Sequence, residues 1–513
     1  MLGVALATGG LTVGVDPAAA QPSPSSGHQS GQSQSGQSGQ PGQQGSSSPS
    51  GPSGRPHSGD QKRPGGASTS PDPKGSRPGQ SGHDRHVHRS VPVQGPVLAA
   101  SGAAGHAPSN QGLQQSLAAP LQDKSLGVLS FAVADAATGQ FLFGSGENTP
   151  ATPASTTKLA TSVAALSLLP ADFRISTRVV KGANPGEIVL VGGGDPTLTA
   201  LPADQIRVGG AGVDADSAPA SMADLAHRTA VALKAAGTTT VKLGFDTSLY
   251  SGPLLHKEHD AMNIAAVTPL MVDEGRIDPR STDEAPARVF DPTGQAVDSF
   301  TAFLKAEGIT VQGKAAQTTA AAGAEVLGQV DSPTVPRLVE RLLTMSDNTL
   351  AEAIARQAAL AAKQPASFAG GVQAVTQALT KLGVPLTGVV LNDGSGLSKE
   401  NLIPPITLVK LLSTAASPDH PELRPVITGL PIAGFTGTLV NRFGAKSGAA
   451  EAAGIVRAKT GSLAGINTLA GTVVDADGRV LAFALMTRTS AGADVARAAV
   501  DRIVAKIAAC GCQ

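Results

Sequence analysis

The sequence predicts an α+β fold: one antiparallel sheet flanked by helices and built from both ends of the folded region, with a lobe inserted between them. Near the start of that region, the apolar runs LGVLSFAVA and QFLFG are joined by the turn-like residues DAATG, which indicates a hairpin. Near its end, INTLAGTVVD and RVLAFALMTR flank DADG in the same way. The long middle, residues 172–325, is rich in Gly and in short β-like runs and is expected to form an inserted, β-rich lobe.

Three segments have helical patterns and should flank this sheet. SNQGLQQSLAAPLQ precedes the first hairpin and predicts a short helix. TTKLATSVAALSLL follows that hairpin with helical spacing and without Gly or Pro. ADVARAAVDRIVAKIAA, near the C-terminus, is amphipathic over several turns. We therefore expect residues 105–171 and 326–513 to form one domain that is interrupted by the lobe.

The N-terminal part has a different composition. Residues 1–20 are apolar and end in small residues, which resembles a secretory signal although the basic start is missing. We expect export, with an uncleaved N-terminal anchor as the alternative. Residues 21–104 are mostly Gly, Ser, Gln and Pro, so they lack the apolar surface needed to order a chain and are expected to form a disordered linker.

Charge and aromatic content narrow the classes of partner. The formal net charge of the 513 residues is zero, and the chain has no Trp and one Tyr. Neither bulk electrostatics nor aromatic stacking therefore favours nucleic-acid binding. Cys510 and Cys512 are the only cysteines, and their spacing leaves free thiols, an intermolecular bond and a bridge between them open.

Three short motifs occur in one order along the chain. The first is Ser155-Thr-Thr-Lys158 at the start of the second helical segment. The second is Ser346-Asp-Asn348 at another expected helix start, and the third is Lys459-Thr-Gly461 just before the second hairpin. Each is weak alone, because such short patterns arise by chance. Together, each in a fitting context, they point to one site.

The first motif has a chemical meaning of its own. Residues three apart on a helix share a face, so Lys158 can reach the hydroxyl of Ser155. A helix N-terminus disfavours a cation. Burial there would lower the pKa of the lysine and leave it neutral, able to take the serine proton. The amides of the same helix end could stabilise an oxyanion.

The three motifs resemble those of penicillin-binding proteins and serine β-lactamases, which share the penicillin-recognising fold. The resemblance implies that Ser155 is the acylated nucleophile, Lys158 its general base and Ser346 a proton relay to the leaving amine. Asn348 would hold the amide of the substrate. The terminal carboxylate would be bound by Lys459 and Thr460, next to Gly461 and Ser462, and the amides of Ser155 and Ser462 would form the oxyanion hole.

The interval between the first and second motifs narrows the resemblance to one class of penicillin-binding proteins. Ser155 and Ser346 are 191 residues apart, as is typical of low-molecular-mass class C penicillin-binding proteins, the D-alanyl-D-alanine carboxypeptidase/endopeptidase family. LVGGGDPTL, NDGSGLS and LPIAGFTGTLVNRF also resemble that family. The resemblance implies a serine peptidase that acts outside the cytoplasm on peptidoglycan, as a carboxypeptidase on stem peptides ending in D-Ala-D-Ala or also as an endopeptidase on D-Ala cross-links. It also implies acylation by β-lactams and the use of no metal or cofactor.

Other interpretations remain beside this one. A serine β-lactamase would carry the same motifs, and a module that only docks on peptidoglycan could retain them without turnover. His256 and His259 have the spacing of metal ligands but no evident third ligand. Glu352 is the only acid between Thr349 and Leu391, and we expect it to be a solvated side chain rather than a base for hydrolysing a penicilloyl ester.

Overall fold

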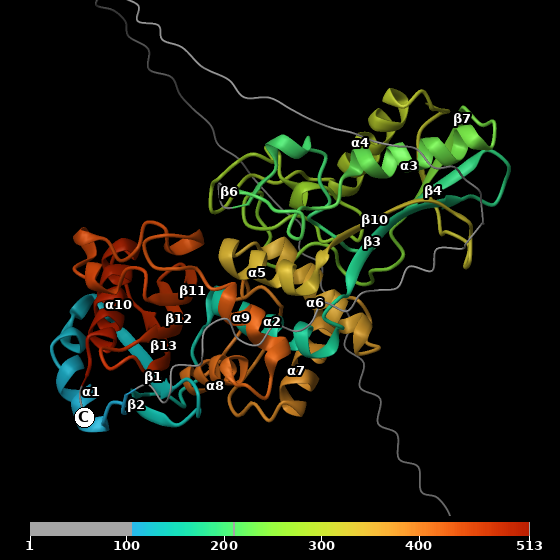
Figure 1. Ribbon diagram of the computed structural model, residues 1–513. Coiled ribbons are helices and arrows are strands. Elements are labelled where there is room, and N and C mark those ends of the chain that lie inside the picture. Colours follow the sequence, from blue (N-terminus) through green and yellow to red (C-terminus); the bar gives the residue numbers. More distant parts are fainter. Residues whose placement is uncertain (1–104, 209–210, 512–513) are drawn as a thin grey trace, which may run out of the picture. The chain divides into compact units, whose positions relative to one another are not determined.

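The structure is a computed structural model that describes residues 105–208 and 211–511 (Figure 1). The signal-like segment 1–20, the linker 21–104 and Cys512 lie outside the described residues. Cys510 lies inside them and is buried. Within the described ranges, no helix combines the length and apolar character needed to cross a membrane.

The predicted antiparallel sheet is present and has five strands in the order β11-β12-β13-β1-β2 (Figure 1). Both predicted hairpins belong to it, one made by β1 and β2 and the other by β12 and β13. β1 pairs with β13, which joins the two ends of the domain in one sheet. The strands are β1 (Val128–Asp135), β2 (Phe141–Ser145), β11 (Val456–Leu463), β12 (Ile466–Val474) and β13 (Val480–Arg488). The edge strand β11, which the sequence did not predict, contains the third motif.

The two faces of this sheet pack against two different cores, because alternate residues of a strand point to opposite sides. On one face, small side chains such as Ala132 and Ala484 meet a helical layer. On the other face, larger ones such as Phe131 and Phe483 meet α1 and α10. The helical layer comprises α2 (Thr157–Leu168), α5 (Val335–Met345), α6 (Asn348–Ala361), α7 (Phe368–Lys381), α8 (Pro405–Ala416) and α9 (Arg424–Thr428), and the opposite face carries α1 (Asn110–Leu117) and α10 (Ala493–Ala508).

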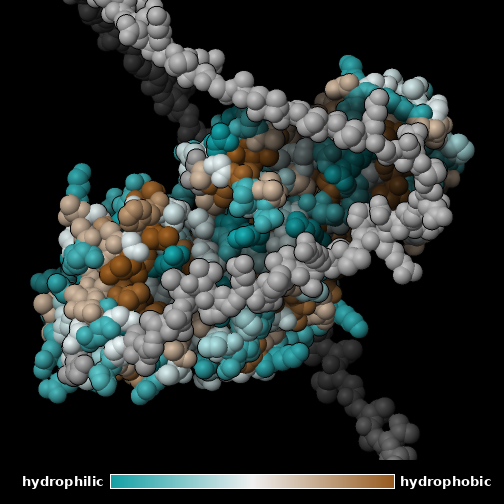
Figure 2. Space-filling model, in the orientation of Figure 1, coloured by the Kyte–Doolittle hydropathy of each residue, from teal (hydrophilic) through white to brown (hydrophobic). Residues whose placement is uncertain are grey.

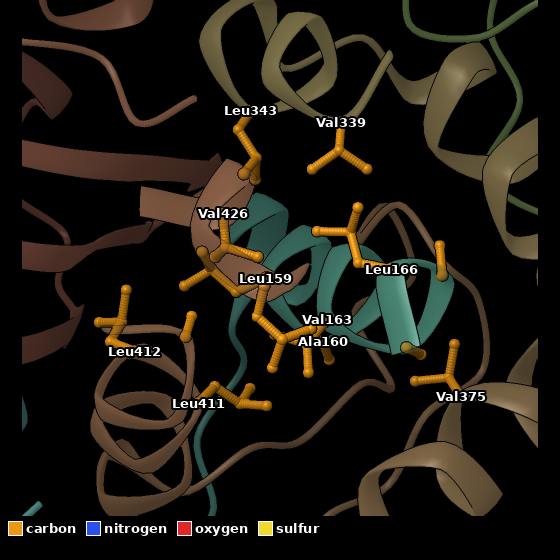
Figure 3. Packing of buried hydrophobic residues seen from close by; sticks show 14 of the residues in the cluster. Leu159, Ala160, Val163, Leu166, Val339, Leu343, Val375, Leu411, Leu412 and Val426 are labelled. Carbon is orange, nitrogen blue, oxygen red and sulfur yellow. The ribbon is translucent and has the colours of Figure 1, made fainter. Parts of the chain in front are cut away.

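Helix α2 is the centre of the helical layer. Every residue from Thr157 to Leu166 is buried, and Figure 3 shows Leu159, Val163 and Leu166 surrounded by side chains of α5, α7, α8 and α9. Burial of each such side chain stabilises the fold by about 1.5–3 kcal/mol. The helix that carries Lys158 is therefore fixed from all sides, which leaves little freedom in where this lysine points.

A second sheet holds most of the strands of residues 172–325. Its strand order is β10-β3-β4-β7-β8, with β9 also paired to β7, and it mixes antiparallel and parallel pairs. Helices α3 (Met222–Ala235) and α4 (Pro292–Ala306) pack with it around a separate core. The strands are β3 (Arg174–Lys181), β4 (Glu187–Val191), β7 (Thr240–Asp246), β8 (Thr310–Val311), β9 (Ala316–Gln317) and β10 (Val326–Thr334), while β5 (Arg207–Val208) and β6 (Ala211–Gly212) pair only with each other.

Large apolar side chains also occur on the surface. Phe290 is 88% exposed, and Phe435 and Ile277 are also largely exposed. On the face shown in Figure 2, the hydrophobic areas are separated by hydrophilic ones. Scattered exposure of this kind is ordinary for a folded protein.

Loop 393–398 packs tightly against the start of α2. Its Gly396 has φ +83°, and a Cβ at that position would lie 1.8 Å from the carbonyl oxygen of Ala154. Any residue other than glycine at position 396 would therefore prevent the loop from approaching Ala154 so closely. Gly237, in the turn after α3, offers a contrast, since it has φ +71° but a Cβ at its position would meet no atom within 4 Å.

We predict that Gly396→Ala lowers the free energy of unfolding by about 2–5 kcal/mol, because a clash adds to the left-handed backbone cost. The matched Gly237→Ala should lose only the backbone term, about 1–2 kcal/mol. Equilibrium unfolding in denaturant measures both. Equal losses in the two variants would show that loop 393–398 is not held tightly against Ala154.

Candidate active site

The first motif lies at the entry to α2. Ser155 belongs to a short 3₁₀ helix, Ala154–Thr156, which leads directly into α2, and its side chain does not cap either helix. The preceding residue, Ala154, has φ 48°, a left-handed conformation that is costly for a residue with a Cβ. Strained backbone of this kind tends to occur at functional sites. Ser155 is half-buried, and because its hydroxyl caps neither helix, this hydroxyl remains available for other contacts.

Lys158 is completely buried, and its Nζ lies close to three oxygen atoms. The distances are 2.9 Å to Ser155 Oγ, 2.7 Å to Asn348 Oδ1 and 2.6 Å to the carbonyl oxygen of Ser395. The last two atoms can only accept hydrogen bonds. A neutral amine has two N–H groups, and these two acceptors use both. Its lone pair then faces the hydroxyl of Ser155, the arrangement that a general base needs.

Burial lowers the pKa of Lys158 to about 8, although the carboxylates of Asp393, Asp347 and Glu352 act in the opposite direction. A buried site disfavours the charged form of an amine, whereas nearby negative charges favour it. Near pH 7, one unit below this pKa, roughly a tenth of this lysine is therefore unprotonated, far more than for a lysine with the ordinary pKa of 10.5. The sequence argument that the lysine is a base rather than a lone cation agrees with this environment.

The second motif bridges α5 and α6. Ser346 has a left-handed backbone, φ 62°, at the end of α5. Its Oγ accepts a hydrogen bond of 2.7 Å from Nζ of Lys459, which also donates to the carbonyl oxygen of Thr460. Burial, and then the charge of Lys158, hold the pKa of Lys459 well below its usual value. The structure thus links Ser346 to the third motif.

Asp347 and Asn348 are fixed by residues of the 172–325 region. Asp347 caps α6 through the amide of Leu350, and Nη2 of Arg288 donates to its carboxylate over 2.8 Å. Burial alone would raise the pKa of Asp347, but Arg288 and Arg276 hold it below its usual range. The Nδ2 of Asn348 donates to the carbonyl oxygen of Asn263, which leaves its Oδ1 directed at Lys158.

The third motif runs along the edge strand β11, directly beside Ser155. A Cβ on Gly461 would lie 2.2 Å from Thr468 Oγ1 and 3.0 Å from the amide nitrogen of Ser155. Only glycine allows the strand and the nucleophile to approach so closely. Thr460 donates to Oγ1 of Thr438, and Arg497 donates to Oγ of Ser462.

A cavity of about 330 Å³ opens over these residues. Five of the eight residues predicted from sequence line it, namely Ser155, Ser346, Asn348, Thr460 and Ser462, together with Asn263, Glu284 and Arg288. Lys158 and Lys459 are buried and are not among the residues that line it. A larger cleft of about 1190 Å³ adjoins the cavity, and Glu284 and Arg497 line both. We place the chemistry in the smaller cavity because the polar groups of all three motifs converge there.

The structure corrects the expectation for Glu352, which is not solvated but completely buried. It lies one turn after Asn348 on α6, and its Oε1 accepts hydrogen bonds from the amides of Gly394 and Ser395. The sequence could not place it, because the loop that it contacts lies more than forty residues away.

His256, which the sequence analysis noted only for its spacing from His259, and Asp393, to which it gave no role, lie near Glu352. His256 Nε2 is 2.9 Å from Asp393 Oδ2, and its Nδ1 accepts from the amide of Glu258. One ligand-type atom of each of His256, Asp393 and Glu352 lies within 4.8 Å of the others. The three are therefore a candidate metal-binding group within the described ranges. His259, the second histidine of the spacing noted in the sequence, is not part of it.

The chain matches the D-Ala-D-Ala carboxypeptidase 3 (S13) family over residues 113–288 and 280–509. It is 39% identical over 415 residues to carboxypeptidase Rv3627c of Mycobacterium tuberculosis, covering 79% of this chain and 85% of that protein. It is 36% identical over 412 residues to carboxypeptidase DacB of Mycolicibacterium smegmatis, with the same coverage of both proteins. The crystal structure of penicillin-binding protein 4 from Haemophilus influenzae matches 77% of this chain and 97% of its own, with a TM-score of 0.59 and 22% identity, and so shares the penicillin-recognising fold. With these matches along nearly all of the described residues, the chain belongs to the D-Ala-D-Ala carboxypeptidase 3 (S13) family.

Proposed function

We propose that this D-Ala-D-Ala carboxypeptidase works through an acyl-enzyme on Ser155, with Lys158 as the general base. The observation that carries the proposal is the position of the buried amine. Nζ lies 2.9 Å from Ser155 Oγ, and two oxygens that can only accept occupy its N–H groups. Among the described residues, Lys158 alone forms a hydrogen bond with Ser155 Oγ.

The reaction begins when Ser155 Oγ attacks the carbonyl carbon of the penultimate D-Ala and its proton passes to Lys158. The negative charge that forms on the carbonyl oxygen is stabilised by the amides of Ser155 and Ser462. The bond to the terminal D-Ala then breaks, and its amine takes the proton held by Lys158, relayed through the hydroxyl of Ser346, which leaves Lys158 neutral again. Water then attacks the ester as Lys158 accepts its proton, and this proton passes to Ser155 Oγ as the ester bond breaks and the shortened peptide leaves.

The remaining predicted residues hold the substrate. Asn348 would bind the amide of the stem peptide, and Thr460 and Ser462 would bind its terminal carboxylate. Lys459 lies behind them, where any positive charge would favour that carboxylate and where it orients the hydroxyl of Ser346. Gly461 keeps β11 close enough to Ser155 for the two oxyanion amides to act together.

The substrate indicates where the protein acts, and this location suggests a role for each part of the chain. Peptidoglycan lies outside the cytoplasm, so we propose that residues 1–20 direct export and that the protein is secreted or N-terminally anchored. Residues 21–104 would be the linker, residues 105–171 and 326–513 the catalytic domain, and residues 172–325 a lobe that shapes the site. The contribution of Asn263, Glu284 and Arg288 to the lining of the cavity supports this role of the lobe.

We predict that penicillin forms a covalent adduct on Ser155 and that Ser155→Ala abolishes it in a protein that stays folded. The matched control is Ser167→Ala on the same helix, since the hydroxyl of Ser167 only donates to the carbonyl oxygen of Ala164. Mass spectrometry of the intact and digested protein locates the adduct. An adduct that persists in Ser155→Ala would disprove the nucleophile.

We predict that the penicilloyl adduct lasts for minutes or longer while D-Ala-D-Ala peptides turn over. The leaving amine of a penicillin stays tethered and obstructs the attacking water. Among the described residues that line the cavity, the acids are Glu284, which is on an exposed loop, and Asp347, which is paired with Arg288. Asp347 is engaged by Arg288, and no hydrogen bond or ion pair with another described residue holds Glu284 in place to activate water at that ester.

Mass spectrometry of the adduct over time and a peptide-release assay check both halves of this prediction. Release of the adduct within seconds, with catalytic penicillin hydrolysis, would indicate a β-lactamase. Acylation without any turnover of D-Ala-D-Ala peptides would indicate the docking module.

We predict that the rate constant of acylation by penicillin rises with pH and levels off above about 8, the pKa of Lys158. Below that pKa the amine is mostly protonated and cannot accept the proton of Ser155, so the rate falls about tenfold for each pH unit. Stopped-flow acylation from about pH 6 to 9 measures the profile. A rate that is constant over this range, or that falls as the pH rises, would exclude Lys158 as the base.

A further inference from the structure

Loop 393–398, which carries the sequence DGSGLS, reaches the centre of the site through its main chain. The carbonyl oxygen of Ser395 accepts a hydrogen bond of 2.6 Å from Nζ of Lys158. The hydroxyl of the same residue is buried and has no hydrogen-bond partner. Ser395 therefore contacts the lysine through its backbone alone, and whatever fixes that backbone also fixes one direction of the amine.

Glu352 fixes this backbone from the side of α6. Its Oε1 accepts hydrogen bonds of 2.9 Å from the amide of Gly394 and 2.8 Å from the amide of Ser395. The amide and the carbonyl of Ser395 thus connect Glu352 to Lys158 across a single residue. Glu352 and Lys158 are both completely buried, so no water competes for these hydrogen bonds.

The rest of the loop is held by neighbouring groups in the same rigid way. Asp393 accepts from the amides of Gly396 and Ser398, over 2.7 and 2.6 Å, and its Oδ2 also lies beside His256. On α2, the hydroxyl of Thr161 donates to the carbonyl oxygen of Gly394. Ser395 is the residue that contacts Lys158. Among the described residues, only Glu352 uses a side chain to bind the amide of Ser395.

We propose that Glu352 is a positioning residue of the reaction: by binding the amides of Gly394 and Ser395, it holds the Ser395 carbonyl on Nζ of Lys158 and so directs the lone pair of this amine at Ser155. Glu352 does not line the cavity, so it touches no substrate. It acts through Lys158 and influences both acylation and the later attack of water.

A metal site is a weaker explanation for the same carboxylate. Its charge already faces a cation, because Nη1 of Arg356 lies 3.6 Å from Glu352 Oε2 and the guanidinium is itself buried against Phe368. The nearby Asp393 oxygens already accept from backbone amides and His256. A divalent ion would have to displace these partners beside the buried guanidinium of Arg356.

The test compares Glu352→Ala with Glu352→Gln in the full chain. Alanine removes the acceptor, so the Ser395 carbonyl can shift and the maximal rate of penicillin acylation should fall at least about tenfold. The carbonyl oxygen of glutamine can still bind both amides, so this rate should stay within about threefold of wild type. Both variants leave Arg356 without its counter-charge and should lose stability. A loss of acylation rate in Glu352→Ala alone would therefore reflect positioning rather than a purely structural role.

Steady-state kinetics with a D-Ala-D-Ala peptide give a second readout. Because Glu352 does not touch substrate, Glu352→Ala should lower kcat and change KM little. The matched control is Asp135→Ala. Asp135 is also a buried carboxylate that accepts from a backbone amide, that of Thr138, but it lies in the β1–β2 hairpin and lines neither the cavity nor the cleft. This variant should lose stability and keep its acylation rate.

A folded Glu352→Ala protein that acylates within about twofold of wild type would overturn the proposal. An equal loss in Glu352→Gln would also overturn it, since the charge rather than the acceptor would then matter. If Glu352→Ala does not fold, Glu352→Asp keeps the charge but withdraws the carboxylate by one methylene, and an unchanged rate in that variant would refute positioning. The inference rests on Ser155 as nucleophile, and failure of that premise would appear separately, as a wild-type protein with no adduct on Ser155.

Discussion

The site depends on the burial of one amine, Nζ of Lys158, away from water. Burial shifts the balance toward the neutral amine, because a buried ammonium loses its hydration whereas a neutral amine can have its hydrogen bonds satisfied. Asn348 Oδ1 and the Ser395 carbonyl satisfy both N–H groups, which leaves Ser155 as the partner of the lone pair. The nearby carboxylates of Asp347, Asp393 and Glu352 keep the pKa from falling much further than about 8. The lysine is thus balanced near the pH at which a base is useful.

Much of the surrounding structure serves to keep these three contacts in place. The core around α2 fixes the helix that carries Lys158 (Figure 3). The 172–325 region fixes Asn348 through the carbonyl oxygen of Asn263. On our proposal, Glu352 fixes the Ser395 carbonyl, and the missing side chain of Gly461 lets β11 lie against Ser155. Groups from four distant parts of the chain therefore determine the direction of one lone pair.

The sequence predicted the parts of this arrangement that depend on local patterns. Alternation and turn residues predicted both hairpins, and the i, i+3 spacing of Ser155 and Lys158 predicted their contact, which the structure shows at 2.9 Å. The order of the three motifs, with the family resemblance, selected residues that the structure brings together around one cavity. The chemical roles of these residues are proposals, because no spacing or distance shows a reaction.

The sequence could not predict contacts that depend on the tertiary fold. Glu352 read as a surface residue because a glutamate on a helix is usually solvated, and only the packing of loop 393–398 against α6 buries it. The pairing of His256 with Asp393 joins residues 137 positions apart, so no spacing could signal it. The edge strand β11 was missed for a similar reason, since its polar motif lacks the alternation typical of strands and it is stabilised by pairing with β12.

The most direct test of the account is to locate the protons on Lys158. Neutron diffraction from deuterium-exchanged crystals at about pH 9, one unit above the pKa of this lysine, would show them. The account predicts two deuterons on Nζ, directed at Asn348 Oδ1 and the Ser395 carbonyl, and a deuteron on Ser155 Oγ directed at the nitrogen. Three deuterons on Nζ at that pH, with Ser155 accepting one of them, would contradict it.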